Sequence, residues 1–146
     1  MIRPVLLLLT CLTLTACNGV DPNSPLGQRK AIFKRMLKTS EDLGGMLRGR
    51  IAFDGQRFTE GAAKLDNLAR QPWQHFPQVK EDQSSAKDEV WQRQERFQQL
   101  AHELEGSTAA LVAATRQQPL TTSALAQPVQ QVEDACEACH QEFRAY

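Results

Sequence analysis

The stretch LAQPVQQVEDACEACHQEFR, residues 125 to 144, carries the most regular apolar repeat of the chain. Its repeating positions follow one another at alternating steps of four and three residues, which is the spacing of one face of an α-helix. These positions are Leu125, Val129, Val132, Cys136, Cys139 and Phe143. Pro128 interrupts the repeat, and because proline removes a backbone hydrogen bond inside a helix, we expect a kink there or a separate turn before it. Both cysteines belong to the face that we expect to turn toward the core.

Three other segments show the same helical spacing. They span residues 26–50, 56–70 and 85–118, and the last of them has Ser85 as a candidate first residue, with Asp88 three places on. Residues 71–85 are irregular and rich in aromatic side chains, so we expect this long loop to fold against something. No segment of useful length alternates with period two, so no strands are predicted. The pattern predicts an all-α protein, an antiparallel four-helix bundle.

The first 16 residues have the pattern of a secretory signal. Arg3 precedes an apolar run that is too short to span a bilayer. The run ends in Leu14-Thr15-Ala16-Cys17, which resembles the lipobox of bacterial lipoproteins and implies lipidation of Cys17; the alternative is an ordinary signal peptide cut nearby. We therefore expect residues 1–16 to be a lipoprotein signal peptide, 17–25 a flexible tether and 26–146 the domain. This predicts a periplasmic protein anchored to the outer membrane of a Gram-negative bacterium.

Composition excludes several classes of partner. The chain of 146 residues has 17 Lys and Arg against 17 Asp and Glu, so no field of one sign points to nucleic acid or another polyanion.

Of the four cysteines, Cys11 leaves with the signal and Cys17 is assigned to lipid. The remaining pair is only three residues apart, in an exported and oxidising setting, where a disulfide between them would close a small strained loop. Another group is expected to hold them.

Cys136, Cys139 and His140 form a Cys-x-x-Cys-His motif, which has three possible readings. A zinc site needs two further ligands, and neither His75 nor His102 has the spacing or a cysteine partner. We expect both histidines to be surface or half-buried side chains. A redox dithiol usually opens a helix after a strand, whereas this motif closes a helix in an all-α chain. The motif is the signature of one covalent haem c, with both thiols joined to vinyl groups and the imidazole on the iron.

The chain resembles the class II c-type cytochromes, and cytochrome c′ most of all, over Leu26 to Tyr146. Besides the motif near the end of the fourth helix, three short stretches carry the resemblance. They are Arg29-Lys30-Ala31-Ile32-Phe33, Gln71-Pro72-Trp73-Gln74-His75-Phe76 and Glu89-Val90-Trp91. Phe143-Arg144 follows the motif, at a position where the family often has Tyr before the basic residue.

The resemblance implies a role for each matching residue. His140 would be the proximal iron ligand, and Arg144, one helical turn later, would lie beside the proximal face. Arg29 would pair with a haem propionate with help from Lys30; the alternative for Arg29 is a solvated residue of the first turn. Trp73 and Phe76 would cover an edge of the haem, or would simply pack the loop.

Phe33 occupies the position that distinguishes members of the family. Six-coordinate relatives have a Met there, whereas Phe cannot bind iron, so the resemblance implies five-coordinate, high-spin iron with a crowded apolar distal face. Met36 is the nearest thioether, and we expect it to pack in the core.

The first functional hypothesis is a gas-binding protein, because NO and CO bind ferrous haem without a distal hydrogen-bond donor. The rival is a periplasmic electron carrier. A peroxidase is disfavoured because no distal His or Arg pair is evident, so we do not expect an enzyme. The resemblance is compatible with a homodimer.

Overall fold

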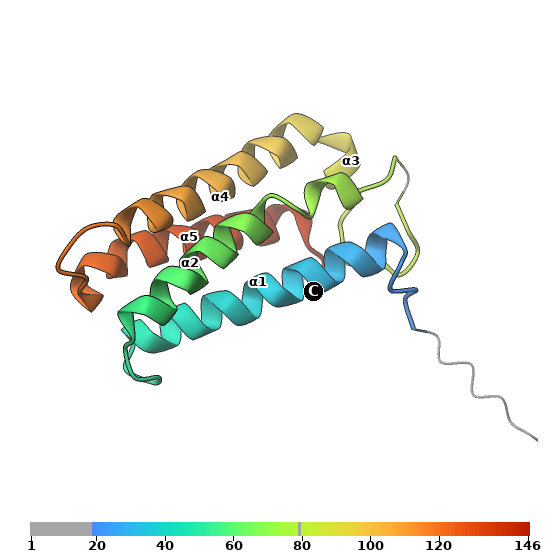
Figure 1. Ribbon diagram of the computed structural model, residues 1–146. Coiled ribbons are helices and arrows are strands. Elements are labelled where there is room, and N and C mark those ends of the chain that lie inside the picture. The colour runs from blue at the N-terminus through green and yellow to red at the C-terminus, as the bar shows by residue number, and fades with distance from the viewer. Residues whose placement is uncertain (1–18, 79) are drawn as a thin grey trace, which may run out of the picture.

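The computed structural model describes residues 19–78 and 80–146, and within these ranges it is a four-helix bundle without a named strand. The expected signal peptide and the expected lipidation site, Cys17, lie outside the described residues. The four long helices are α1 (Pro25–Leu47), α2 (Gly55–Ala69), α4 (Gln94–Ala114) and α5 (Thr122–Phe143), and they run side by side in Figure 1. Two short elements join α2 to α4: the 3-10 turn η1 (Trp73–His75) and the helix α3 (Glu89–Gln92). The predicted fold class is confirmed.

Side-chain caps explain where three of the long helices begin. Ser24 accepts a hydrogen bond from the amide of Gly27, Asp54 from Arg57 and Thr121 from Ala124. Each bond satisfies an amide that has no partner inside its own helix. Helix α1 therefore starts at Pro25, one residue before the expected domain boundary, and proline suits this first helical position.

The end of α1 differs from the sequence prediction. We expected the helix to continue to Arg50, but it ends at Leu47. Gly49 adopts a left-handed backbone with φ of 72° two residues later, a conformation that glycine enters without steric cost. Turn formation at this glycine stops the helix before the apolar stripe itself has ended.

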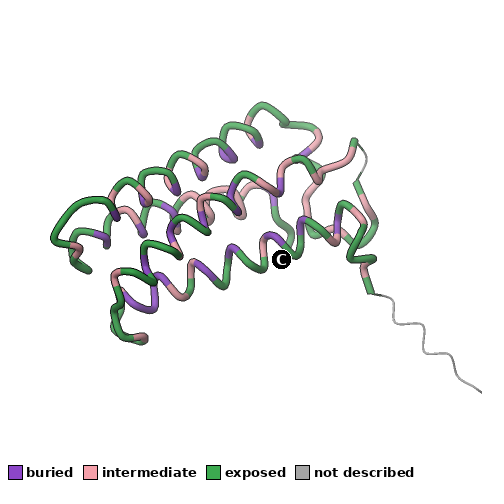
Figure 2. The backbone as a smooth tube through the Cα atoms, in the orientation of Figure 1, coloured by how far each residue is buried: buried purple, intermediate pink, exposed green. Residues whose placement is uncertain are grey.

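The main core fills the space between the four long helices. Its most deeply buried side chains include Phe58 of α2, Leu111 of α4 and Leu125 of α5, each at most 1% exposed. Buried residues recur along the inward face of every long helix in Figure 2. Four of the six repeat positions in α5 are buried, namely Leu125, Val129, Val132 and Phe143. Burial of such apolar side chains is the main force that assembles the bundle.

The predicted third helix, residues 85–118, is wrong in three respects, one of which is that α4 ends at Ala114 and not at residue 118. It is split into α3 and α4 at Arg93, whose backbone (φ −123°, ψ 51°) is not helical. Ser85 is not its first residue, because the Ser85 carbonyl accepts a hydrogen bond from the amide of Ala145 at 2.8 Å. This bond pairs Ser85 with the C-terminal segment, and helix begins only at Glu89.

Pro128 does not break α5. The helix is continuous from Thr122 to Phe143 with Pro128 inside it, so the separate turn that we considered is absent from this described segment. The hydrogen bond that proline cannot donate would go to the carbonyl of Ala124, an exposed residue of the first turn. Water can satisfy a carbonyl at that position, which lowers the cost of the proline.

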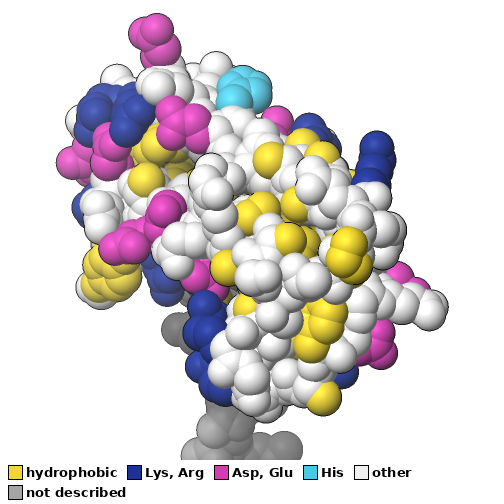
Figure 3. All heavy atoms as spheres, turned by 90° about the vertical axis from the view of Figure 1, so that its left-hand side faces the viewer, with side chains coloured by type: hydrophobic (Ala, Val, Ile, Leu, Met, Phe, Trp, Pro, Cys, Tyr) yellow, Lys and Arg dark blue, Asp and Glu magenta, His cyan; other side chains and the backbone are white. Residues whose placement is uncertain are grey.

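Helix packing leaves the two ends of the bundle different. Helix α4 packs along α5, and α1 packs along α2. The end that contains the α1–α2 and α4–α5 turns, seen in Figure 3, shows apolar side chains with cations and anions mixed around them. In the described part of the chain, no helix is both long and apolar enough to cross a membrane. The opposite end, where α1 starts and α5 ends, contains the cavity described next.

Candidate haem site

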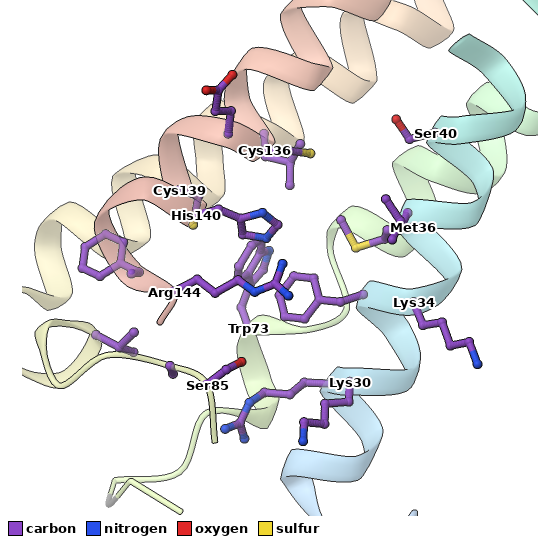
Figure 4. Close-up of a pocket in the computed structure, with 18 of the residues that line it drawn as sticks. Lys30, Lys34, Met36, Ser40, Trp73, Ser85, Cys136, Cys139, His140 and Arg144 are labelled. Carbon is purple, nitrogen blue, oxygen red and sulfur yellow. The ribbon is translucent and has the colours of Figure 1, made fainter. Parts of the chain in front are cut away.

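A cavity of about 690 Å³ lies between the first half of α1, the end of α5 and the loop that follows α2. Figure 4 shows Lys30, Lys34, Met36 and Ser40 on the α1 side of it, and Cys136, Cys139 and His140 on the α5 side. The volume is typical of sites that bind a cofactor or a small molecule. All nine residues that the sequence predicted for a haem site line this cavity: Arg29, Lys30, Phe33, Trp73, Phe76, Cys136, Cys139, His140 and Arg144.

The two cysteines and the histidine come from the last two turns of α5. Cys136 packs against the main core, and Cys139 packs against a second apolar cluster made by Val90, Phe97, Leu100 and Phe143. Both cysteines are half-buried rather than buried. Their place on the inward stripe is as predicted, but they border a cavity at this end of the bundle, so side chains cover them only in part.

Electrostatics at this end of α5 argue against a redox dithiol. Burial raises the pKa of both the Cys136 and the Cys139 thiol to about 11. Reactive redox thiols have a lowered pKa, because the thiolate is the nucleophile. In the described ranges no group of three or more His, Cys, Asp and Glu side chains is placed to hold a metal ion. The zinc reading of the motif therefore finds no further ligands there.

His140 is prepared to act as a neutral ligand. Burial lowers its pKa, and the positive charge of Arg144 lowers it further. A neutral imidazole keeps a nitrogen lone pair free, which is the form that binds metals. The Arg144 amide donates to the His140 carbonyl at 3.1 Å, so Arg144 ends the helix directly beside the histidine. The predicted nearness of Arg144 to His140 is present.

Aromatic rings make up much of the cavity wall. Phe33 of α1 and Trp73 of η1 meet edge to face with their centroids 6.0 Å apart. Trp73 also meets Phe97, which in turn contacts Phe76 at 4.9 Å and Phe143 at 5.3 Å between centroids. Such pairs add stability beyond the area that they bury. Phe97 lies in the segment 85–118 that was predicted to be helical, and helical spacing carries no signal that it borders a cavity.

The chemistry of the wall fits a flat, largely apolar group with polar substituents. Two thiols and a neutral imidazole lie on α5, and aromatic rings line the loop and α1. The Trp73 indole Nε1–H is buried and has no hydrogen-bond partner among the described residues. A buried donor normally has a partner, so an acceptor on a bound group would satisfy it. The residues present therefore fit a haem.

Arg29 is buried, so the alternative of a solvated residue is wrong. Its side chain is 3% exposed, and it donates to the His75 carbonyl and to the Ser84 hydroxyl, both at 2.9 Å. Its Nη1 also lies 2.7 Å from Glu81 Oε2, in ionic contact but without the alignment of a hydrogen bond. The guanidinium sits 4.6 Å from the ring centre of Phe76. Pairing of Arg29 with a haem propionate stays a prediction, and the protein groups around Arg29 were not predicted.

The remaining predicted residues keep more ordinary surroundings. Lys30 is exposed, and its Nζ donates to the Gln83 carbonyl at 3.3 Å. His75 is half-buried and His102 is exposed, as expected. Met36 is 5% exposed and belongs to the main core, as predicted, but it also lines the cavity.

The sequence matches the family model for cytochrome c′ over residues 24–144. The chain belongs to the cytochrome c′ family. Proteins of this family carry a covalently attached c-type haem, so the cofactor of this chain is one haem c, with Cys136 and Cys139 present for its attachment. A sequence search of curated proteins finds no significant match.

Solved cytochromes c′ have the same fold. The protein from Shewanella frigidimarina matches with a TM-score of 0.80 at 22% identity, over 88% of this chain and all of its own. Cytochrome c′ from Rubrivivax gelatinosus gives a TM-score of 0.75 at 22% identity, over 84% of this chain and 98% of that one. A mutant from Alcaligenes xylosoxidans, solved as its nitric oxide complex, gives 0.78 at 20% identity, over 88% and 98% of the two chains. At these identities the likeness concerns the fold.

Proposed function

We propose that this cytochrome c′ binds NO or CO at its haem iron, with His140 as the single protein ligand. The haem supplies the ligand-binding and redox chemistry, and the protein decides which ligands can approach. His140 would hold the iron from the α5 side of the cavity. Cys136 and Cys139 would fix the haem in one orientation through two covalent bonds, so the other face would be turned toward α1.

The position of Phe33 on α1 is the observation that carries this proposal. It lines the cavity from the helix opposite to His140, and the edge-to-face contact with Trp73 holds its ring. A phenyl ring can neither bind iron nor donate a hydrogen bond. Bound dioxygen depends on a distal donor, whereas NO and CO do not, so an apolar ring at this place favours NO and CO.

Relatives have been solved with both gases. Structures of cytochrome c′ from Alcaligenes xylosoxidans include nitric oxide complexes and a carbon monoxide complex of mutant forms. Gas binding by these proteins supports the same activity here. The role that we propose for it is scavenging of NO, for protection and not as an enzyme, by a lipoprotein held at the periplasmic face of the outer membrane. A homodimer is compatible with this role.

Electron transfer is the second candidate, and one surface feature favours it. Lys30, Lys34 and Lys38 recur every fourth residue along α1, and Leu37 beside them is 61% exposed while it also lines the cavity. An apolar side chain with cations around it, next to the cofactor, suits a transient contact with an acidic redox protein. Lys38 pairs with Asp42 at 2.7 Å, which leaves the row less charged than its sequence suggests.

The coordination and spin state of the iron in the ferric, haem-loaded protein test the proposal most directly. Absorption and electron paramagnetic resonance spectra should show five-coordinate, high-spin iron. A six-coordinate, low-spin spectrum would contradict it, and Met36 would then be the first side chain to replace, with Met36→Leu as the matched variant. Fast exchange of electrons with a periplasmic partner, unchanged when NO is present, would instead favour electron transfer.

A further inference from the structure

The segment 81–87 connects the two sides of the haem cavity. On the α1 side, Arg29 contacts Glu81 and donates to Ser84, and Lys30 donates to the carbonyl of Gln83. These contacts join residues that are more than fifty positions apart in the chain. The segment is therefore fixed to α1 by tertiary bonds, although it contains no helix of its own.

The same segment holds the chain that follows His140. The Lys87 amide donates to the Phe143 carbonyl at 2.9 Å, and the Ala145 amide donates to the Ser85 carbonyl at 2.8 Å. These two bonds flank an antiparallel bridge between Ala86 and Arg144. The C-terminal segment 143–145 is thus held in place by residues 85–87.

Ser84 is the joint between the two sets of contacts. Its hydroxyl oxygen accepts from Arg29 Nη2 at 2.9 Å and from the Ala86 amide at 3.1 Å. Ala86 is the residue that forms the bridge with Arg144. One oxygen therefore links a buried arginine of α1 to the backbone that pairs with the C-terminal segment.

Glu81 adds a second hold on the same arginine. Its Oε2 is buried and makes no hydrogen bond among the described residues, so the ionic contact with Arg29 is its compensation. The Glu81 side chain is only partly buried, but its Oε2 is cut off from water, so loss of the ionic contact with Arg29 would leave that charged oxygen without compensation. Loss of Arg29 would therefore release both Ser84 and Glu81.

We propose that Arg29 is a positioning residue for His140, which acts through Ser84 and the C-terminal segment. Helix α1, which carries Phe33, would in this way set the orientation of His140 on the opposite wall of the cavity. This role differs from the propionate pairing that the family resemblance implies. The positioning role of Arg29 does not depend on which gas the iron binds.

The test compares Ser84→Ala with Ser84→Thr in the haem-loaded protein. Thr keeps a hydroxyl that can accept both hydrogen bonds, whereas Ala removes it. Loss of one net hydrogen bond should speed hydrogen exchange of the Lys87 and Ala145 amides by roughly fivefold. We expect the iron–histidine stretch of the ferrous protein, measured by resonance Raman spectroscopy, to shift in Ser84→Ala and to stay at the wild-type frequency in Ser84→Thr.

Two further variants distinguish the positioning of His140 by Arg29 from a direct contact between Arg29 and the haem. Glu81→Gln keeps Arg29 but weakens its ionic contact, so it should speed exchange at the same amides. Lys38→Gln, which removes an exposed ion pair of the same helix, should change neither measurement. Unchanged exchange and an unchanged stretch in Ser84→Ala and Glu81→Gln would overturn the proposal. Equal changes in Ser84→Ala and Ser84→Thr would overturn it as well, since the hydroxyl would then not be the cause.

Discussion

Phe33 and His140 face one cavity from different helices, so the two sides of the haem can be tested by separate substitutions. Phe33→Ala removes the ring that meets Trp73 edge to face. We expect CO to bind the ferrous protein faster, by roughly tenfold, which corresponds to a barrier lower by about 1.4 kcal/mol. Flash photolysis measures this rate. Leu47→Ala, at the far end of α1, is the control, and equal rates in Phe33→Ala and wild type would show that another group limits access.

Single residues of the site were predictable where a motif or a helical period places them. Cys136, Cys139 and His140 follow from the motif, and their inward face follows from the repeat along α5. Glu81 and Ser84 were not predicted, because their contacts with Arg29 reach across more than fifty residues and the loop carries no period that could announce them. The spacing of apolar residues predicts which face of a helix is buried. It does not predict which loop packs against that face.

At the scale of the elements, the end of α5 is held against α3 and α4 by one carboxylate between two arginines. Glu142 Oε1 accepts from Arg96 Nε at 3.0 Å and Nη2 at 2.7 Å, and Oε2 accepts from Arg93 Nη2 at 2.9 Å. Arg93 is the residue at which the predicted third helix is split, and its guanidinium also lies over the Phe143 ring at 5.7 Å. These tertiary contacts are absent from any local pattern, which is why the helix stripes were predicted and the break was not.

Glu142→Gln should therefore lower the thermal unfolding temperature in a pH-dependent way. Hydrogen bonding from Arg96 is the main cause that lowers the pKa of Glu142 below its ordinary 4.5. A carboxyl with a lowered folded pKa stabilises the protein above its unfolded pKa, and loses this effect as the pH falls through the folded value. The difference between variant and wild type should be full above pH 4.5 and should shrink in more acidic solution. Glu95→Gln on the exposed face of α4 is the control, and a difference that does not depend on pH would exclude the charge as its cause.

The whole molecule offers a way to test where it resides. The described chain enters α1 at the end of the bundle that holds the cavity (Figure 1). Cys17 and Ser24 are seven positions apart in the chain, so their Cα atoms can be separated by at most about 25 Å, and a lipid on Cys17 would keep the haem near the membrane surface. Cys17→Ser should move the protein from the membrane fraction to the soluble periplasmic fraction, as immunoblots of fractionated cells would show. Retention in the membrane would refute the anchor and leave the haem proposal untouched.

Removal of the haem should loosen the two apolar clusters to different extents. The cluster of Val90, Phe97, Leu100 and Phe143 borders the cavity, whereas Phe58, Leu111 and Leu125 belong to the main core between the four long helices. Without the haem, the side chains that line the cavity of about 690 Å³ lose their contacts with it. The cluster of Val90, Phe97, Leu100 and Phe143 should therefore lose its fixed packing.

The double variant Cys136→Ala, Cys139→Ala, produced without haem supply, makes this measurable. Far-ultraviolet circular dichroism should stay helical, while hydrogen exchange at Phe97 and Leu100 becomes fast and exchange at Leu111 and Leu125 stays slow. The haem-loaded wild type is the reference. Equal loss of protection in both clusters would mean that the haem is needed to assemble the whole bundle. The packing predicts instead that the main core stays folded without the haem and that the haem orders the end at which the chain enters and leaves.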